Sequence, residues 1–137
     1  MSVVWRESLA IGISEIDSQH KELLARFGNL LAACKESRGI SELRSLLAFL
    51  DDYVIVHFRD EEQLQVQHNY PDQAEHKRQH TYFIARLKEL KQEVESDGVA
   101  LHHVIEVNNM LLNWLINHIS VVDKELGRFL QEARKGN

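Results

Sequence analysis

The clearest hydrophobic pattern in the chain runs through residues 41–65. Positions on one side recur at spacings of 4, 3, 4, 3, 4 and 3 residues: Leu43, Leu47, Leu50, Val54, His57, Glu61 and Leu64. This repeat is typical of one face of an α-helix. Five of the seven positions are apolar, but a histidine and a glutamate four residues apart occupy the other two. Since an unpaired charge in a core costs on the order of several kcal/mol, something in the core must bind an imidazole nitrogen and a carboxylate together.

The same spacing of 3 or 4 residues recurs in three other segments. Together the patterns predict four helices, over about residues 18–37, 41–65, 71–95 and 99–134. Residues 1–16 are predicted to form an extended arm, and Asp17 or Ser18 is the expected N-terminal cap of the first helix. No stretch shows sustained alternation with a period of two, so no sheet is expected. The prediction is an all-α fold, a single domain of residues 1–137 built as an up-down-up-down antiparallel four-helix bundle.

Composition and charge exclude several classes of function. The chain has 137 residues and a net charge of −5, and no cluster of basic residues suggests binding to nucleic acid or to an anionic membrane. The most apolar stretch, residues 110–122, is interrupted by polar side chains, so no membrane insertion is expected. The arm carries charged residues rather than the apolar run of a signal peptide, and the single cysteine, Cys34, is expected in the core of the first helix. These features predict a cytoplasmic location.

Ionisable side chains lie on the apolar stripe of every predicted helix. They are His20 on the first, His57 and Glu61 on the second, His76 and His80 on the third, and His118 on the fourth. Asp123 follows His118 by five residues, which in a regular helix turns its side chain about 140° away. Either a local π-bulge or a bridging position to one side of the histidine would bring the two together. Glu62, in contrast, points about 100° away from Glu61 and is expected at the surface.

Five imidazoles and two carboxylates that converge inside a bundle indicate a metal site. The donors are all nitrogen and oxygen, without thiolate, which argues against zinc–cysteine and iron–sulfur sites. They are too many for one tetrahedral zinc ion, whereas two octahedral ions bridged by carboxylates would use them all. The pattern also differs from that of ferritin-like di-iron bundles, because the chain contains no Glu-x-x-His sequence.

The sequence resembles the hemerythrins, and among them the single-domain bacteriohemerythrins. The resemblance rests on four motifs that span nearly the whole chain in the family's order: Gly12-Ile13-x-x-Ile16-Asp17-x-Gln19-His20, His57-Phe58-x-x-Glu61-Glu62, Tyr70-Pro71 followed by His76-x-x-x-His80, and Trp114-Leu115-x-x-His118-Ile119-x-x-x-Asp123. One departure is Gln65, because the family often has a methionine at this position, four residues after the glutamate.

The resemblance implies a non-haem di-iron centre with an oxo or hydroxo bridge. It places one iron on His76, His80 and His118 and the other on His20 and His57, with Glu61 and Asp123 bridging the two. The iron with two histidines would keep the open position for O2. The resemblance also places Leu115 beside the O2 pocket, with Phe58, Trp114 and Ile119 completing its wall.

Three functions are compatible with such a centre. The first is reversible O2 binding, in a carrier, storage or delivery protein, and it is favoured because the sequence shows no proton donor beside the open position. The second is a di-iron enzyme that reduces peroxide or nitric oxide. The third is a module that senses oxygen or iron, which is less favoured because sensors are commonly fused to output domains. A protein that receives the O2 is not identified by the sequence.

Overall fold

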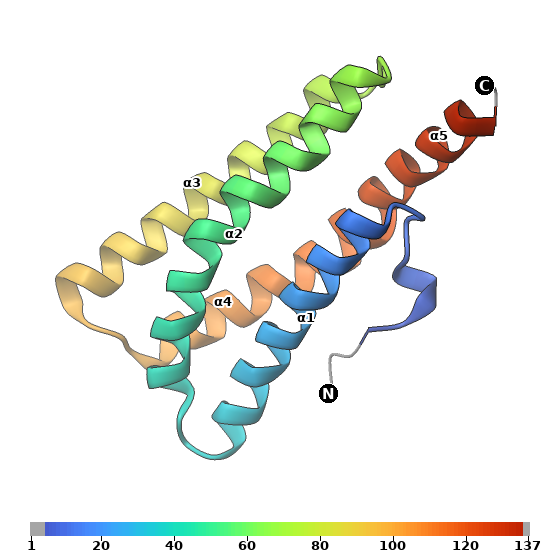
Figure 1. Ribbon diagram of the computed structural model, residues 1–137. Helices are drawn as coiled ribbons and strands as arrows, with labels where there is room; N and C mark the ends of the chain where they lie inside the picture. The colour runs from blue at the N-terminus through green and yellow to red at the C-terminus, as the bar shows by residue number, and fades with distance from the viewer. Residues whose placement is uncertain (1–4, 136–137) are drawn as a thin grey trace.

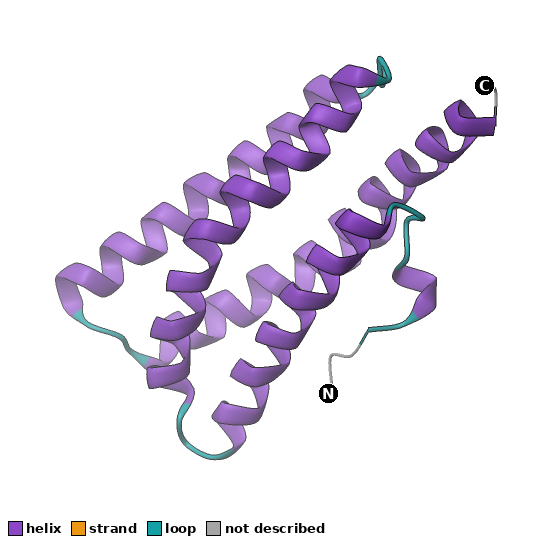
Figure 2. Ribbon diagram, viewed as in Figure 1, coloured by secondary structure: helices purple, strands orange, loops and turns teal. Residues whose placement is uncertain are grey.

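The computed structural model describes residues 5–135, which form a bundle of long antiparallel helices preceded by an arm (Figure 1). The elements are a short 3₁₀ helix η1 (Glu7–Leu9), α1 (Ser14–Lys35), α2 (Gly39–Gln67), α3 (Gln73–Asp97), α4 (Leu101–Asn113), the π-helix η2 (Trp114–Asp123) and α5 (Lys124–Lys135). Because α4, η2 and α5 follow one another without a break, they make the fourth rod of the bundle. The described residues contain no strand (Figure 2), so the predicted all-α, up-down-up-down bundle is confirmed. None of the described helices is long and apolar enough to cross a membrane.

The helix ends differ from the predicted ones by up to four residues. The largest difference is at α1, which begins at Ser14, because Asp17 does not cap the helix from outside. Its carboxylate instead accepts hydrogen bonds from the backbone N–H groups of Ile11 (2.8 Å) and Gly12 (3.3 Å). The N-terminal arm therefore contacts the first turn of α1, and its first four residues lie outside the described part of the chain.

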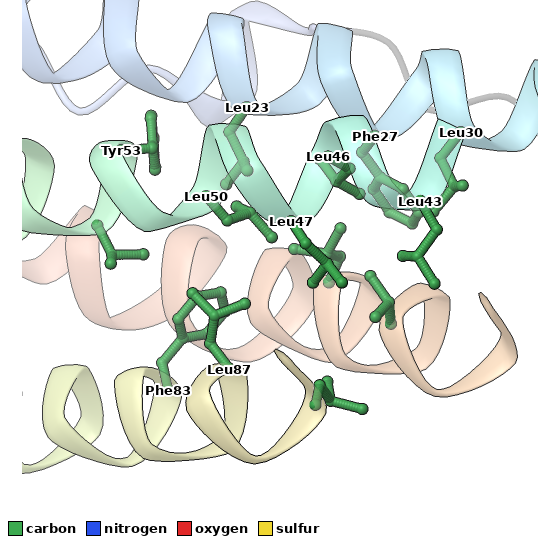
Figure 3. Close-up of a cluster of buried hydrophobic side chains, with 14 of the residues drawn as sticks. Leu23, Phe27, Leu30, Leu43, Leu46, Leu47, Leu50, Tyr53, Phe83 and Leu87 are labelled. Carbon is green, nitrogen blue, oxygen red and sulfur yellow. The ribbon is translucent and has the colours of Figure 1, made fainter. Parts of the chain in front are cut away.

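The main core fills one half of the bundle. Figure 3 shows leucine and aromatic side chains of α1, α2 and α3 pointing toward one another, with Leu30, Leu43 and Leu50 fully buried. Each such side chain contributes about 1.5–3 kcal/mol by leaving water. Cys34 is not part of this core, contrary to the prediction, because the neighbouring Ala33 takes the buried position and the thiol is exposed.

A second, smaller core lies at the other end, where the arm packs on α5. It consists of Ile11, Ile13, Ile16, Tyr70, Leu126 and Leu130. The arm approaches α5 so closely that a Cβ atom on Gly127 would lie 2.3 Å from the backbone oxygen of Ile11. Lys124 donates a hydrogen bond to the backbone oxygen of Ser8. The arm thus closes this end of the bundle.

The π-helix η2 decides which way Asp123 points. Over Trp114–Asp123 the fourth rod widens, and the Ser120 hydroxyl donates a hydrogen bond to the backbone oxygen of Leu115, five residues earlier (2.8 Å). A π-turn needs more residues per revolution than an α-turn, so five residues rotate a side chain less far past its starting direction. Of the two predicted alternatives, the π-distortion is the one present, and it brings Asp123 and His118 into contact.

Candidate metal centre

The seven predicted ligand side chains meet in one place, between the two apolar cores. On α2, Phe58 belongs to the main core and Leu64 packs against the second, and Glu61 lies between them. The four rods together supply the seven side chains, all of them buried: His20, His57, Glu61, His76, His80, His118 and Asp123. No side chain of the set is more than 2% exposed. This depth follows from the apolar stripes, because the five histidines and Glu61 replace core residues in the helical repeats, and the π-helix η2 turns Asp123 inward beside them.

Glu61 lies between two groups of histidines. One carboxylate oxygen, Oε1, is 2.6 Å from Nε2 of His57 and 3.5 Å from Nε2 of His20. The other oxygen, Oε2, is 3.0 Å from Nε2 of His76 and 3.4 Å from Nε2 of His80. The two oxygens of one carboxylate therefore face different sets of imidazoles.

Asp123 repeats this arrangement from the fourth rod. Its Oδ2 is 3.1 Å from Nε2 of His20, whereas Oδ1 is 2.9 Å from Nε2 of His76 and 3.1 Å from Nε2 of His118. The donors fall into two groups, each with its ligand atoms within 4.8 Å of one another: Glu61, His76, His80, His118 and Asp123 in one, and His20, His57, Glu61 and Asp123 in the other. Both carboxylates belong to both groups.

The chemistry of these donors fits metal ions. All five Nε2 atoms and all four carboxylate oxygens of the set are buried, and none has a partner in hydrogen-bond geometry. Buried polar atoms are nearly always hydrogen-bonded, and each unpaired one costs about 1–3 kcal/mol. The five nitrogens and four oxygens point at one another, and bound cations would give all nine atoms a partner. The absence of a thiolate from the set favours metals that accept nitrogen and oxygen ligands.

The pKa values show how the cluster holds its charges. Burial would lower the pKa of His20 and His76, but the carboxylates of Asp123 and Glu61 outweigh burial and raise them to about 10 and about 9. For His118, burial prevails and lowers the pKa. Burial also opposes ionisation of Glu61 and Asp123, yet the surrounding histidines hold the pKa of each below its usual value. Cations bound here would replace the protons on the histidines.

Three of the histidines are oriented from behind, through the ring nitrogen that faces away from the cluster. Nδ1 of His57 donates to Oε1 of Gln19 (2.6 Å), and Nδ1 of His118 donates to Oε1 of Gln79 (2.7 Å). Each glutamine amide is in turn fixed by a carboxylate, because Gln19 donates to Asp60 (2.8 Å) and Gln79 to Glu75 (3.3 Å). Because the amide nitrogen of each glutamine points at a carboxylate, its amide oxygen must point at the histidine. The ring nitrogen Nε2 of that histidine is then directed into the cluster.

The third partner is a carboxylate. Oε2 of Glu62 lies 3.0 Å from Nδ1 of His80, although the sequence analysis expected Glu62 at the surface. The side chain lies only partly at the surface, with 29% of it exposed, because a direction about 100° from Glu61 on α2 leads toward α3. Gln19 stood in the first motif without an assigned role, and Gln79 was not singled out from the sequence. Each directly precedes a predicted ligand, and this position is the signal that could have found them.

Aromatic rings cover one side of the cluster. Phe58 stacks on His80 with ring centres 3.9 Å apart and planes 3° apart, and Trp114 stacks on His118 at 3.7 Å and 13°. Phe58 also lies 5.6 Å from the ring of His57. Of the other residues predicted for the O2 pocket, Ile119 is buried in the main core and Leu115 packs against it, half-buried.

Gln65 introduces polarity on α2 one turn beyond Glu61. Its side chain is 1% exposed, and its Nε2 has no hydrogen-bond partner. It lies toward the second core, on the opposite side of Glu61 from Phe58. The departure from the family pattern at this position therefore places a buried amide one helical turn from Glu61, on the side away from Phe58.

Comparison with known proteins agrees with this geometry. The family model of the hemerythrin HHE cation-binding domain matches residues 11–130. A bacteriohemerythrin of Stenotrophomonas maltophilia is 32% identical over 98% of this chain and 90% of that protein. A bacteriohemerythrin of Pseudomonas paraeruginosa is 32% identical over 85% of this chain and 74% of that protein, and a myohemerythrin of Riftia pachyptila is 29% identical over 88% and 87%. The chain belongs to the hemerythrin family.

Proposed function

We propose that this protein binds O2 reversibly at a carboxylate-bridged di-iron centre. The observation that carries the proposal is the pair of donor groups that share both Glu61 and Asp123. In this assignment one iron is held by His76, His80 and His118 and the other by His20 and His57. An oxo or hydroxo group would be the third bridge.

The unequal donor groups support an open position on one ion. One group contains five side chains and the other four. With one bridging oxygen shared between them, the group with three histidines would supply six donors to an ion and the other group five, which would leave one octahedral position open. Two ferrous ions held by these residues would supply the two electrons that reversible binding of O2 requires.

The side chains around the centre favour binding over reduction, because reduction needs protons. Tyr53 is stacked on His57, with ring centres 5.0 Å apart, and its hydroxyl already donates to the backbone oxygen of Gln19 (2.8 Å). Burial and the charges of Glu61 and Asp123 raise the pKa of Tyr53 well above its usual value, so it is a poor acid. Phe58, which caps His80, offers no proton at all. These neighbours support a carrier, storage or delivery role over the reduction of peroxide or nitric oxide.

Optical spectroscopy of the reduced, iron-loaded protein tests the proposal. Addition of O2 should produce a new absorption band, removal of O2 under argon should abolish it, and a second addition should restore it. The same sample should turn over little peroxide or nitric oxide with excess reductant. A band that does not reverse, together with sustained turnover, would identify the protein as a di-iron enzyme instead.

A further inference from the structure

The hydrogen bonds behind the histidines differ in charge. His57 and His118 each donate to a neutral glutamine amide, and the nearest carboxylate is one hydrogen bond further away. His80 donates directly to the carboxylate of Glu62. The direct carboxylate contact therefore belongs to the group with three histidines.

Glu62 is well placed to act on this histidine. Its side chain is 29% exposed and lines a groove between α2 and α3, so part of the carboxylate reaches water while Oε2 faces His80. Phe58 holds the same imidazole ring from its face, in a nearly parallel stack at 3.9 Å. The ring of His80 is thus constrained in both plane and rotation, and its Nε2 points at Glu61.

We propose that Glu62 is a positioning residue that makes the two halves of the centre electrically unequal. A carboxylate draws the Nδ1 proton of an imidazole more strongly than an amide does, and the opposite nitrogen becomes a stronger electron donor. An ion held by His76, His80 and His118 would therefore be favoured in its more positive, ferric state. The inference rests on the proposed di-iron centre and adds to it a residue that sets the reduction potential.

A merely structural role for Glu62 is the competing explanation, because the hydrogen bond to His80 also joins α2 to α3. The two explanations predict different results for charge changes at constant shape. Glu62→Gln keeps a hydrogen-bond acceptor but removes the charge. Gln79→Glu adds a carboxylate behind His118 in the same half of the centre. Glu22→Gln removes the charge of an exposed carboxylate that lines a separate groove beside His57, and serves as the control.

The experiment measures iron per chain, unfolding midpoint and reduction potential for the wild type and the three variants. Glu62→Gln should shift the potential to more positive values, by about 59 mV for each tenfold loss of ferric over ferrous preference. Gln79→Glu should shift it in the opposite direction, and Glu22→Gln should leave it unchanged. In metal-depleted protein, Glu62→Gln should also weaken Co²⁺ binding by about 10- to 100-fold.

The inference is overturned if Glu62→Gln and Glu22→Gln have the same potential, or if Gln79→Glu and Glu62→Gln shift it in the same direction. Gln79→Glu remains decisive if Glu62→Gln folds poorly, because the direction of its shift alone tests the argument. Failure of the di-iron proposal has a different signature, since the wild type itself would then hold fewer than two irons per chain.

Discussion

Removal of the Glu61 carboxylate should abolish most of the stability that iron confers. Glu61 is fully buried, and its two oxygens lie 2.6–3.5 Å from four different histidine nitrogens. In the proposed assignment Glu61→Ala reduces the protein donors from five and four to four and three. Both ions lose a ligand in a single substitution, which no histidine variant can achieve.

The expected magnitude follows from binding linkage. An ion present at 100 times its dissociation constant stabilises the folded state by about 2.7 kcal/mol, so two ions contribute about 5 kcal/mol. For a domain of 137 residues this corresponds to a rise of about 15–20 °C in unfolding midpoint. If Glu61→Ala weakens each site about 100-fold at the same free iron concentration, the stabilisation that the two ions confer falls from about 5 to about 1 kcal/mol.

The assay is thermal unfolding under anaerobic conditions, with and without ferrous iron, for each variant. The quantity compared is the midpoint increase on iron loading within one variant, because Glu61→Ala also changes the iron-free protein. His68→Ala is the matched control from the end of the same helix. It loses one hydrogen bond, from Nδ1 to the backbone oxygen of Leu64 (3.0 Å), whether or not iron is bound. Iron loading should therefore raise its unfolding midpoint as much as it raises that of the wild type. Equal increments in Glu61→Ala and His68→Ala would refute the site assignment.

Four further predictions concern composition, oxygen stability, pH and packing. Iron-loaded protein should contain two irons per chain by metal analysis, and one iron or one zinc at full occupancy would contradict the paired donor groups. Leu115→Ala should keep both irons but lose its oxygenated band faster in air than the wild type, and Leu115→Asp faster still, because water gains access; unchanged decay in both would remove Leu115 from the pocket. Folding raises the pKa of His20 and of His76 to about 10 and about 9, so their protonation stabilises the iron-free protein fully below about pH 6.5. This contribution should decline as the pH rises and be lost above about pH 9 to 10. Urea unfolding of the iron-free protein at about pH 7 and at about pH 10 would show the loss. Gly127→Ala should destabilise the fold by about 1–3 kcal/mol in urea, since its Cβ would meet the backbone of Ile11 at 2.3 Å; an unchanged midpoint would show that the arm can move aside.

The sequence by itself determined the helices and most of the candidate site. A helix repeats every 3.6 residues, so its buried face can be read from one segment without knowledge of its neighbours. Polar residues on such a face, as at His57 and Glu61, are conspicuous because an unpaired polar group in a core is costly. The same reasoning located His20 and His80 on other helices, although it could not show that the four faces meet at one level.

The tertiary structure decided the features that depend on a neighbouring helix. Ala33 and Cys34 are both small, and only the packing of α1 shows which of them is buried. Glu62 contacts His80 on α3 as well as water because α3 lies beside α2 at that point, and a periodicity within α2 carries no information about this neighbour. The direction of Asp123 depends on the π-helix, whose wider turns change the angle between residues five apart. The π-helix lets Asp123 reach His118 on the preceding turn and His20 on α1, and the contact with α1 exists only in the folded bundle.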